Sequence, residues 1–587
     1  MAHRPAASVS IVIQPSMPEQ ADLLQILKAH WGYPSFRLGQ GEIIAHVVEG
    51  HDALALLPTG GGKSVIYQVA GLARGGLTIV VTPLIALMED QVANLKRRGI
   101  CALAVHSGLG PQEVQRRLDA AMHGDFSFLY LSPERLLTQN FLLRLEEMEV
   151  RLLAIDEAHC ISQWGQDFRP AYRRIGELRE RLAGVPVLAV TATATPRVAE
   201  DIKHQLGMPR ARQFSSTFRR PGLSYRVGSF PDGIGTVHRI LSRGLGPAIV
   251  YALYRNEVEQ LASILSGRGI RAAAYHGGMP AEDRFSVQGA FMRGELEVIV
   301  ATNAFGMGID KEDVRVVINL GLPEDLEAYY QEAGRGGRDG QGAMAYLLYG
   351  QEDAARLEAN WRSKYPERAV VDRLVGQLMG ALSLQPGDDT STPLDFNLKD
   401  FCHGHGWREW DARSVLGLLE REGVLRYDPE PVPSLRIRLT APTELLRTVG
   451  REDERLDRLF RYLLATYPDI RSFPAEVSGR GLQLAVRLTQ IALERLLASC
   501  ASRGWLEVEH LEPVGSVELL TPLCPNWPLE LDWEGIAQRR EADYQRLQHM
   551  VAYAYNDAIC RERVLREYFG EEVTEDCGLC GVCRARG

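Results

Sequence analysis

The sequence predicts an α/β protein: two domains with parallel sheets, followed by a winged-helix-like α+β region and a small cysteine-rich C-terminal module. Three observations support this fold class. Short apolar runs alternate with helix-length segments from about residue 52 to 350, a helix–glycine–hairpin pattern occurs twice between residues 394 and 520, and four of the nine cysteines lie within residues 560–583. The length of 587 residues is enough for about four domains.

The apolar runs define two sets of strands. The first set contains LTIVVTP, FSFLYLSP, LLAIDEAH and VPVLAVTAT, and the second contains AIVYALY, RAAAYHG, EVIVATN and VRVVINLG. Strands that are apolar on both faces indicate parallel sheets covered by helices on both sides. The segment SSTFRRPGLSYRVGSFPDG (215–233) lacks this pattern, so we expect it to be a linker between two α/β domains.

The pattern changes from about residue 351. Residues 394–427 predict an amphipathic helix that ends at Gly423 and precedes a short strand, with SLRIRLT as its hairpin partner. Residues 491–510 repeat this order around Gly504, with GSVELLTP as the return strand. Two winged helices in tandem have this pattern, and so do two unrelated helix–hairpin pieces. Residues 536–569 then predict one or two helices.

These patterns divide the chain into five predicted regions. They are a disordered tail (1–20), a first α/β domain (21–212), a second α/β domain (213–350), an inserted winged-helix-like region (351–535) and a helical metal-binding module (536–587).

Composition excludes some classes of protein and leaves others open. Hydrophobic residues make up 45% and charged residues 24% of the chain, as in ordinary globular proteins. The longest apolar stretch, LTIVVTPLIALM (77–88), is shorter than the ~18 residues that span a membrane, and the N-terminus lacks the apolar core of a secretion signal. The cysteine distribution favours a reducing cytosol. With a net charge of −9, any nucleic-acid-binding surface must be local.

The segment PTGGGKS (58–64) has the pattern of a phosphate-binding loop between an apolar strand and a helix. Its glycines let backbone N–H groups face phosphates, and the helix N-terminus adds positive potential. In such a loop Lys63 reaches the β- and γ-phosphates and the Ser64 hydroxyl binds Mg²⁺. The general pattern has a glycine where Leu57 stands. The predicted nucleotide-binding residues of the loop are Thr59, Gly60, Gly61, Gly62, Lys63 and Ser64.

Two further groups complete a predicted ATP site. Asp156 and Glu157 close the strand RLLAIDEAH, where a carboxylate that binds Mg²⁺ next to a base that orients water suits attack on a γ-phosphate. Arg335 and Arg338 lie in QEAGRGGRDG (331–340), at the end of the second α/β domain. A nucleotide held by the first domain would lie between the domains, where these arginines stabilise transition-state charge.

These motifs, in this order, resemble those of superfamily 2 helicases and more specifically those of the RecQ DNA helicases. The segments VTPLIALMEDQ, LSPERLL, VTATATP, AFGMGIDKEDVR and YYQEAGRGGRDG match in sequence and spacing. The resemblance covers roughly residues 22–350 and 540–583, and it implies that both α/β domains are RecA-like. The catalytic set that it implies is Lys63, Asp156, Glu157, His159, Gln331, Arg335 and Arg338.

The segment WGYPSFRLGQGEII (31–44) resembles the adenine-recognition motif of the same family. The resemblance implies that Tyr33 and Arg37 stack on the base while Gln40 hydrogen-bonds its edge.

The residues behind the carboxylate pair, in AIDEAHCISQWGQDFRP (154–170), resemble the aromatic-rich loop of RecQ helicases. The resemblance implies that Trp164, Phe168 and Arg169 contact single-stranded DNA and couple it to ATP hydrolysis. A surface loop with incidental aromatic residues is the alternative.

The C-terminal cysteines predict a metal site. Cys560 lies on a helix, and Cys577, Cys580 and Cys583 form two overlapping CxxC turns. Four thiolates suit tetrahedral Zn²⁺, and the spacing also suits an iron–sulfur cluster. The segment CR…YFGE…C..C..C resembles the zinc-binding module of the RecQ family, which favours zinc. That module typically follows the helicase core directly, whereas here some 190 residues intervene, so the family's duplex-binding surface cannot be transferred.

The resemblance implies an ATP-dependent 3′–5′ DNA helicase that unwinds duplex or branched DNA in repair and recombination. Its expected cofactors are ATP, Mg²⁺ and Zn²⁺, and its expected partners are tailed or branched DNA and single-strand-binding or recombination proteins. We expect it in the cytoplasm, at the nucleoid, without a membrane partner. An RNA helicase, or a DNA-annealing scaffold with a weak ATPase, is the alternative.

Overall fold

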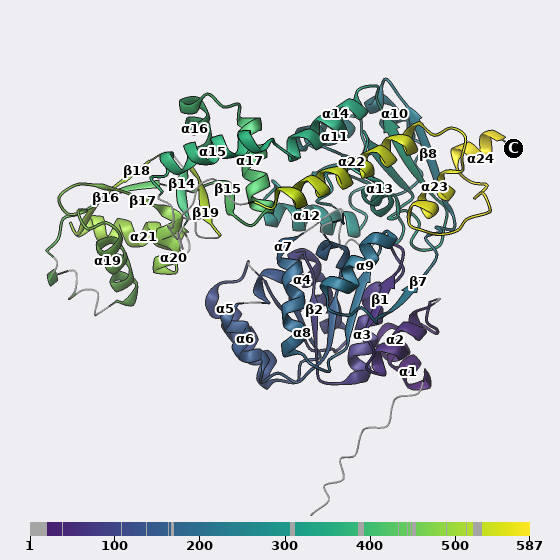
Figure 1. The fold of residues 1–587 in the computed structure, drawn as a ribbon, viewed down its shortest axis with the longest axis horizontal. Coiled ribbons are helices and arrows are strands. Elements are labelled where there is room, and N and C mark those ends of the chain that lie inside the picture. The colour runs from purple at the N-terminus through teal and green to yellow at the C-terminus, as the bar shows by residue number, and fades with distance from the viewer. Residues whose placement is uncertain are drawn as a thin grey trace, which may run out of the picture. The chain divides into compact units, whose positions relative to one another are not determined.

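The computed structural model describes residues 20–37, 39–106, 108–136, 138–162, 164–165, 169–305, 311–384, 393–432, 434–442, 444–445, 448, 453–488, 490–511, 514–520 and 531–586. The predicted tail lies outside these residues except for Gln20, which begins the first helix. The chain forms two compact units, one of residues 1–357 with 541–587 and one of residues 358–540 (Figure 1). Among the described residues, no helix has both the length and the apolarity needed to cross a membrane.

The first lobe of the first unit is a seven-stranded parallel sheet in the order β3-β4-β2-β5-β6-β1-β7. Every residue of β1, β2, β4 and β6 is buried, so both faces of the sheet are covered, as the apolar runs predict. The strands are β1 (Ala53–Leu56), β2 (Leu77–Val81), β3 (Ala102–Val105), β4 (Phe128–Leu131), β5 (Val150–Ile155), β6 (Val187–Thr191) and β7 (Arg212–Ser215).

Nine α-helices among the described residues accompany this sheet, together with three short 3₁₀ turns. The helices are α1 (Gln20–Trp31), α2 (Gln40–Val48), α3 (Lys63–Arg74), α4 (Ile85–Arg97), α5 (Pro111–His123), α6 (Gln139–Leu145), α7 (Pro170–Arg173), α8 (Leu178–Arg181) and α9 (Pro196–Gln205).

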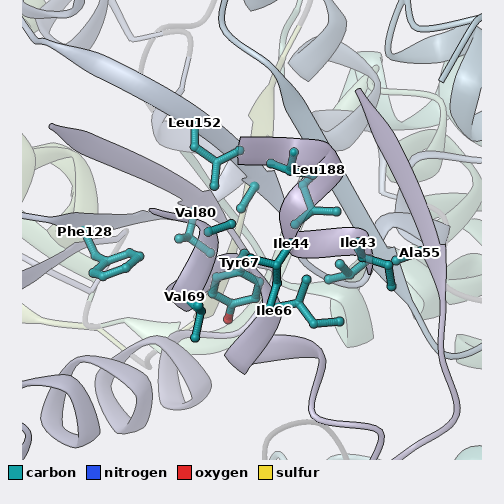
Figure 2. Close-up of a cluster of buried hydrophobic side chains, with 14 of the residues drawn as sticks. Ile43, Ile44, Ala55, Ile66, Tyr67, Val69, Val80, Phe128, Leu152 and Leu188 are labelled. Atoms are coloured by element: carbon teal, nitrogen blue, oxygen red, sulfur yellow. The ribbon is translucent and has the colours of Figure 1, made fainter. Parts of the chain in front are cut away.

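The core of this lobe fixes the position of α3. Figure 2 shows Ile66 of α3 beside Ile44 of α2, and Val69 of α3, with Val80 and Leu188 of the sheet, belongs to the same cluster. All of these side chains are almost fully buried. Because α3 is held along its length by this apolar face, its first turn, which begins at Lys63, is held at the edge of the sheet where the strands end.

The second lobe is a six-stranded parallel sheet in the order β10-β11-β9-β12-β13-β8. Its strands are β8 (Leu223–Ser229), β9 (Ala248–Ala252), β10 (Ala272–Tyr275), β11 (Val298–Ala301), β12 (Val316–Leu320) and β13 (Ala343–Tyr349). Its helices are α10 (Gly233–Leu241), α11 (Arg255–Gly267), α12 (Ala281–Met292), α13 (Leu326–Ala333) and α14 (Asp353–Lys364).

The expected linker over residues 215–233 is wrong in part, because Leu223–Ser229 forms the edge strand β8. This strand alternates apolar and polar residues (LSYRVGS), so it lacks the continuous apolar run used to find the other strands. The segment between the lobes is therefore residues 216–222, which we call the interlobe linker.

The predicted helical stretch 536–569 forms two helices near the C-terminus. These are α22 (Trp533–Tyr555) and α23 (Arg561–Tyr568), and they are followed by the short helix α24 (Gly581–Arg586). Residues 541–586, which belong to the first unit and hold the four C-terminal cysteines, are called the cysteine module below.

The second unit contains two helix–sheet clusters with separate apolar cores. The first has the sheet order β14-β19-β15 and the second β17-β16-β18, and all pairs are antiparallel. The first cluster consists of α15 (Arg368–Ala381), β14 (Leu394–Phe396), α16 (Leu398–His405), α17 (Glu409–Arg421), β15 (Leu425–Val432) and β19 (Val514–Leu519). The second consists of β16 (Ser434–Leu439), α19 (Glu454–Thr466), β17 (Ala475–Ser478), α20 (Gly479–Val486), α21 (Gln490–Ser502) and β18 (Leu506–His510).

The two predicted hairpins of this region are wrong in their pairing. β15 pairs with β19 rather than with β16, and β18 pairs with β16 rather than with β19. Val432 lies opposite Val514 and Leu435 opposite His510, so β15 pairs with β19 and β16 with β18 in two successive antiparallel ladders, one within the other along the chain. The second cluster is thus inserted in the chain between the two strands of the β15–β19 hairpin. Among the described residues, each cluster has three helices and a three-stranded sheet.

This nesting predicts that the second cluster can be removed without unfolding the first. Replacing residues 433–513 by Asn-Gly would close the β15–β19 hairpin with a two-residue turn. We expect the shortened protein to remain folded and to keep its ATPase activity, since the apolar core of the first cluster contains no residue from 433–513. Circular dichroism and thermal unfolding measure this. Loss of more helix than the deleted residues contribute would contradict it.

Candidate functional site

The phosphate-loop residues connect β1 to α3 with the backbone that the glycines predict. Gly60 and Gly62 have φ angles of 76° and 72°, in the left-handed region. A Cβ atom on Gly61 would lie 2.9 Å from the Pro58 carbonyl oxygen. Lys63 and Ser64 open helix α3, so the loop leads directly into a helix N-terminus, which favours phosphate.

A cavity of about 380 Å³ lies between the two lobes of the first unit. It is lined by groups from the first lobe and by groups from the second, as the sequence predicts for a shared nucleotide cleft. The predicted site residues that line it are Tyr33, Arg37, Gln40, Thr59, Gly60, Gly61, Gly62, Lys63, Ser64, Asp156, Glu157, Gln331, Arg335 and Arg338.

The three residues expected to recognise adenine lie beside the phosphate loop. The Arg37 guanidinium donates a hydrogen bond to the Gly60 carbonyl. The Gln40 amide donates to the carbonyls of Gly61 (3.0 Å) and Gly62 (3.3 Å), and its oxygen accepts from the Arg37 N–H (2.9 Å). Tyr33 is exposed at the cavity wall. Arg37 and Gln40 therefore brace the loop in this structure, and contact with the base stays a prediction.

The carboxylates of Asp156 and Glu157 follow β5 and form an acidic corner of the cavity. Burial, and then the neighbouring Glu157 carboxylate, raise the pKa of Asp156 above its usual value, while Lys63 opposes the rise. Glu157 has a φ angle of 47°, and its Oε2 lies 3.8 Å from Lys63 Nζ. That oxygen is buried and accepts no hydrogen bond within the described part of the chain. A buried, under-compensated carboxylate pair fits a divalent cation such as Mg²⁺.

His159 connects this corner to the second lobe. It is fully buried, with Nδ1 at 3.5 Å from Glu157 Oε2 and 2.8 Å from the Thr191 hydroxyl. Two residues further on, the Thr193 hydroxyl accepts a hydrogen bond from the Gln331 amide (2.9 Å), and the Thr193 N–H lies 3.3 Å from Thr191 Oγ1. A connected set of polar contacts thus runs from the carboxylate pair to helix α13 of the other lobe.

The two predicted arginines follow α13 in a turn that we call the arginine turn (residues 334–338). Arg335 is buried, and its Nε atom has no hydrogen-bond partner among the residues that the structure describes. The Arg338 side chain lies against the phosphate loop, since a Cβ atom on Gly60 would be 3.3 Å from Arg338 Cγ. Both line the cavity, where cationic groups can meet a phosphate held by the first lobe.

The aromatic-rich loop is only partly described, and Phe168 lies outside the described residues. The Arg197 guanidinium of α9 covers the Trp164 ring at 3.6 Å from its centroid. The Trp164 carbonyl accepts a hydrogen bond from Arg546 of α22. Arg169 donates instead to the Pro83 carbonyl (3.2 Å). Trp164 is thus held by two cationic side chains, and its contact with DNA stays a prediction.

The four C-terminal cysteines form one compact cluster. Their Sγ atoms all lie within 4.8 Å of one another, with Cys580 Sγ at 3.4 Å from Cys583 Sγ and 4.0 Å from Cys560 Sγ. A tetrahedral zinc ion with bonds of about 2.3 Å holds its sulfurs about 3.8 Å apart. The backbone N–H of Cys577 points to Cys560 Sγ (3.2 Å), as expected around thiolate ligands. The cluster fits a single zinc ion rather than a larger iron–sulfur cluster.

Two parallel-sheet lobes that share one cleft are the architecture of superfamily 2 helicases, and two family profiles match the two lobes, while a third matches the cysteine module. The DEAD/DEAH box helicase profile matches residues 37–202, and the helicase conserved C-terminal domain matches residues 234–340. The RecQ zinc-binding profile matches residues 530–584.

Curated relatives narrow the class to a family. The chain is 43% identical over 432 residues to the probable ATP-dependent DNA helicase RecS of Bacillus subtilis, covering 69% of this chain and 87% of that protein. It is 41% identical over 341 residues to the ATP-dependent DNA helicase RecQ of Haemophilus influenzae, covering 58% of this chain and 55% of that one. The chain belongs to the RecQ family. It spans a little over half the length of the Haemophilus relative.

The structure adds three groups that the sequence did not single out. Arg220 of the interlobe linker hydrogen-bonds both the phosphate loop and the arginine turn. Thr191 and Thr193 lie in the matched segment VTATATP, which could have drawn attention to them. Arg220 offers no such local signal, since its partners are 161 and 114 residues away along the chain.

The cysteine cluster predicts about one zinc ion per chain. A Cys580→Ser variant should lose the metal and unfold at a lower temperature, because the short module has little apolar core of its own. Elemental analysis and thermal unfolding measure both effects. Cys101→Ser, which changes an exposed cysteine far from the cluster in sequence, is the matched control. Bound iron, or zinc retained in full by Cys580→Ser, would contradict the assignment.

Proposed function

We propose that this protein is an ATP-dependent DNA helicase that moves 3′ to 5′ and unwinds duplex or branched DNA in repair and recombination. The observation that carries the proposal is a cavity lined by the phosphate loop and carboxylates of one lobe and by Arg335 and Arg338 of the other. The relatives named as ATP-dependent DNA helicases support it.

In this proposal the first lobe holds the nucleotide. Lys63 contacts the β- and γ-phosphates, and Ser64 and Asp156 hold Mg²⁺, which supplies neutralising charge when bound. Glu157 orients the attacking water and accepts its proton, a role that suits a carboxylate whose Oε2 accepts no hydrogen bond among the described residues and lies within reach of Lys63. Tyr33, Arg37 and Gln40 recognise the base, for which Arg37 and Gln40 must loosen their hold on the loop.

The second lobe supplies Arg335 and Arg338, which stabilise the charge of the transition state. Gln331 connects this lobe to the first through its hydrogen bond to Thr193. Cycles of ATP binding and hydrolysis then close and open the cleft and step the two lobes along one strand.

The aromatic-rich loop gives the proposed link between DNA and ATP. Opening one base-pair step costs about 1.4 kcal/mol on average, and stacking one base on an aromatic ring returns about 1–3 kcal/mol. The free energy of one or two aromatic contacts therefore offsets the free energy of opening one base-pair step. For unwinding, Trp164 and Phe168, with Arg169, can thus matter more than the overall net charge of −9.

The remaining assignments belong to the same proposal. The domain boundaries at residues 20, 212, 350 and 535 are retained as predictions, with the two clusters of the second unit as winged helices, one nested in the other. We propose that the protein works in the cytoplasm at the nucleoid and cooperates there with single-strand-binding or recombination proteins.

Strand displacement tests the proposed activity. We expect the protein, with ATP and Mg²⁺, to separate a duplex that has a 3′ single-stranded tail and to fail on a duplex with a 5′ tail. A Lys63→Ala variant should be inactive on both, since it lacks the phosphate contact. Lys364→Ala, at the end of α14, is the matched control and should unwind normally. Failure on tailed and branched substrates alike, or unwinding by Lys63→Ala, would refute the proposal.

A further inference from the structure

Arg220 lies between the phosphate loop and the arginine turn, the two halves of the proposed ATP site. It belongs to the interlobe linker, and only 8% of its surface is exposed. Its Nη1 donates to the Thr59 carbonyl (3.0 Å), the Thr59 hydroxyl (2.8 Å) and the Gly334 carbonyl (2.5 Å), and its Nη2 donates to the Gly336 carbonyl (2.9 Å). One guanidinium therefore joins the phosphate loop of the first lobe to the arginine turn of the second.

The cysteine module holds the linker residues that precede Arg220. The Glu571 carboxylate accepts hydrogen bonds from the Phe218 N–H and from the Thr217 hydroxyl (3.2 Å). The ring of Phe218 stacks on Phe569, with centroids 4.7 Å apart and an interplanar angle of 14°. The Phe218 carbonyl accepts a hydrogen bond from Tyr330 of α13 (3.0 Å). The linker is thus fixed on one side by the cysteine module and on the other by the helix that leads into the arginine turn.

We propose that Arg220 is a positioning residue that sets the distance between the arginine turn and the phosphate loop, and that the cysteine module fixes Arg220 through Phe218. The inference rests on the proposed ATPase function and deepens it. It gives the cysteine module a part in the alignment of the hydrolytic site.

The chemistry of a guanidinium explains why this position needs arginine. Its planar fork can donate to several carbonyl oxygens at once, whereas the single ammonium of lysine cannot match that geometry. The arginine turn also lies very close to the phosphate loop, since a Cβ atom on Gly334 would be 2.1 Å from Thr59 Oγ1. Arg335 and Arg338 follow within four residues of Gly334, so a shift of this turn moves both away from the γ-phosphate.

Steady-state ATP hydrolysis with saturating single-stranded DNA tests the role of Arg220. In Arg220→Ala we expect kcat to fall about 10- to 100-fold, since a displacement of about 1 Å in a catalytic group can cost about 100-fold. The KM for ATP and the binding of a non-hydrolysable analogue should change little, because Lys63 and the phosphate loop remain. The unfolding temperature should fall, because the carbonyl groups that Arg220 contacts lose their donor. Arg220→Lys should recover only part of kcat. Arg243→Ala, which removes an exposed arginine just after α10, is the matched control and should resemble the wild type.

Glu571→Ala tests the part played by the cysteine module. It should lower kcat in the wild-type background and have little further effect in Arg220→Ala, because both changes disturb one alignment. Losses that multiply independently would refute the connection through the linker. A normal kcat in Arg220→Ala, or a fall of kcat together with lost nucleotide binding, would refute the positioning role. Absence of DNA-stimulated hydrolysis in the wild type would instead refute the proposed function.

Discussion

The predicted ATP site depends on the close approach of the phosphate loop to the arginine turn, where the Thr59 hydroxyl donates a hydrogen bond to the Gly334 carbonyl (3.2 Å). Parallel sheets gather their loops at the edge where the strands end. Each lobe therefore carries half of the predicted site at one edge, and both halves line one cavity. The contact brings the edges within reach of one phosphate group, and it is close enough that residue 334 must lack a side chain.

Helix α13 receives contacts from both the ATP corner and the aromatic-rich loop. At its C-terminal end Gln331 donates to Thr193, which continues toward His159 and Glu157. At its N-terminus Asp325 caps the helix by accepting from the Ala328 N–H (2.8 Å) and lies 3.8 Å from Arg546, the residue that also binds the Trp164 carbonyl. A change at either place would reach the helix that carries the arginine turn, which is a physical route for the proposed coupling between DNA and ATP.

The sequence predicted the elements and most of the site, because both follow local patterns. The apolar runs gave the parallel strands, and glycine-rich and acidic motifs marked the phosphate loop and the carboxylate pair. Strand partners in the second unit could not be predicted in the same way, because 81 residues (433–513) lie between β15 and β19 and adjacency no longer identifies a partner. The role of Arg220 was also hidden, since it depends on residues brought together only by the folding of both lobes.

ATP hydrolysis measured with single-stranded DNA, with RNA of matched sequence and without nucleic acid, in the wild type and in Trp164→Ala, shows whether the ATP site responds to DNA through the aromatic-rich loop. We expect strong stimulation of the wild type by DNA, little by RNA, and a large loss of DNA stimulation in Trp164→Ala with ATP binding intact. Equal stimulation by DNA and RNA, or full DNA stimulation in Trp164→Ala, would contradict it.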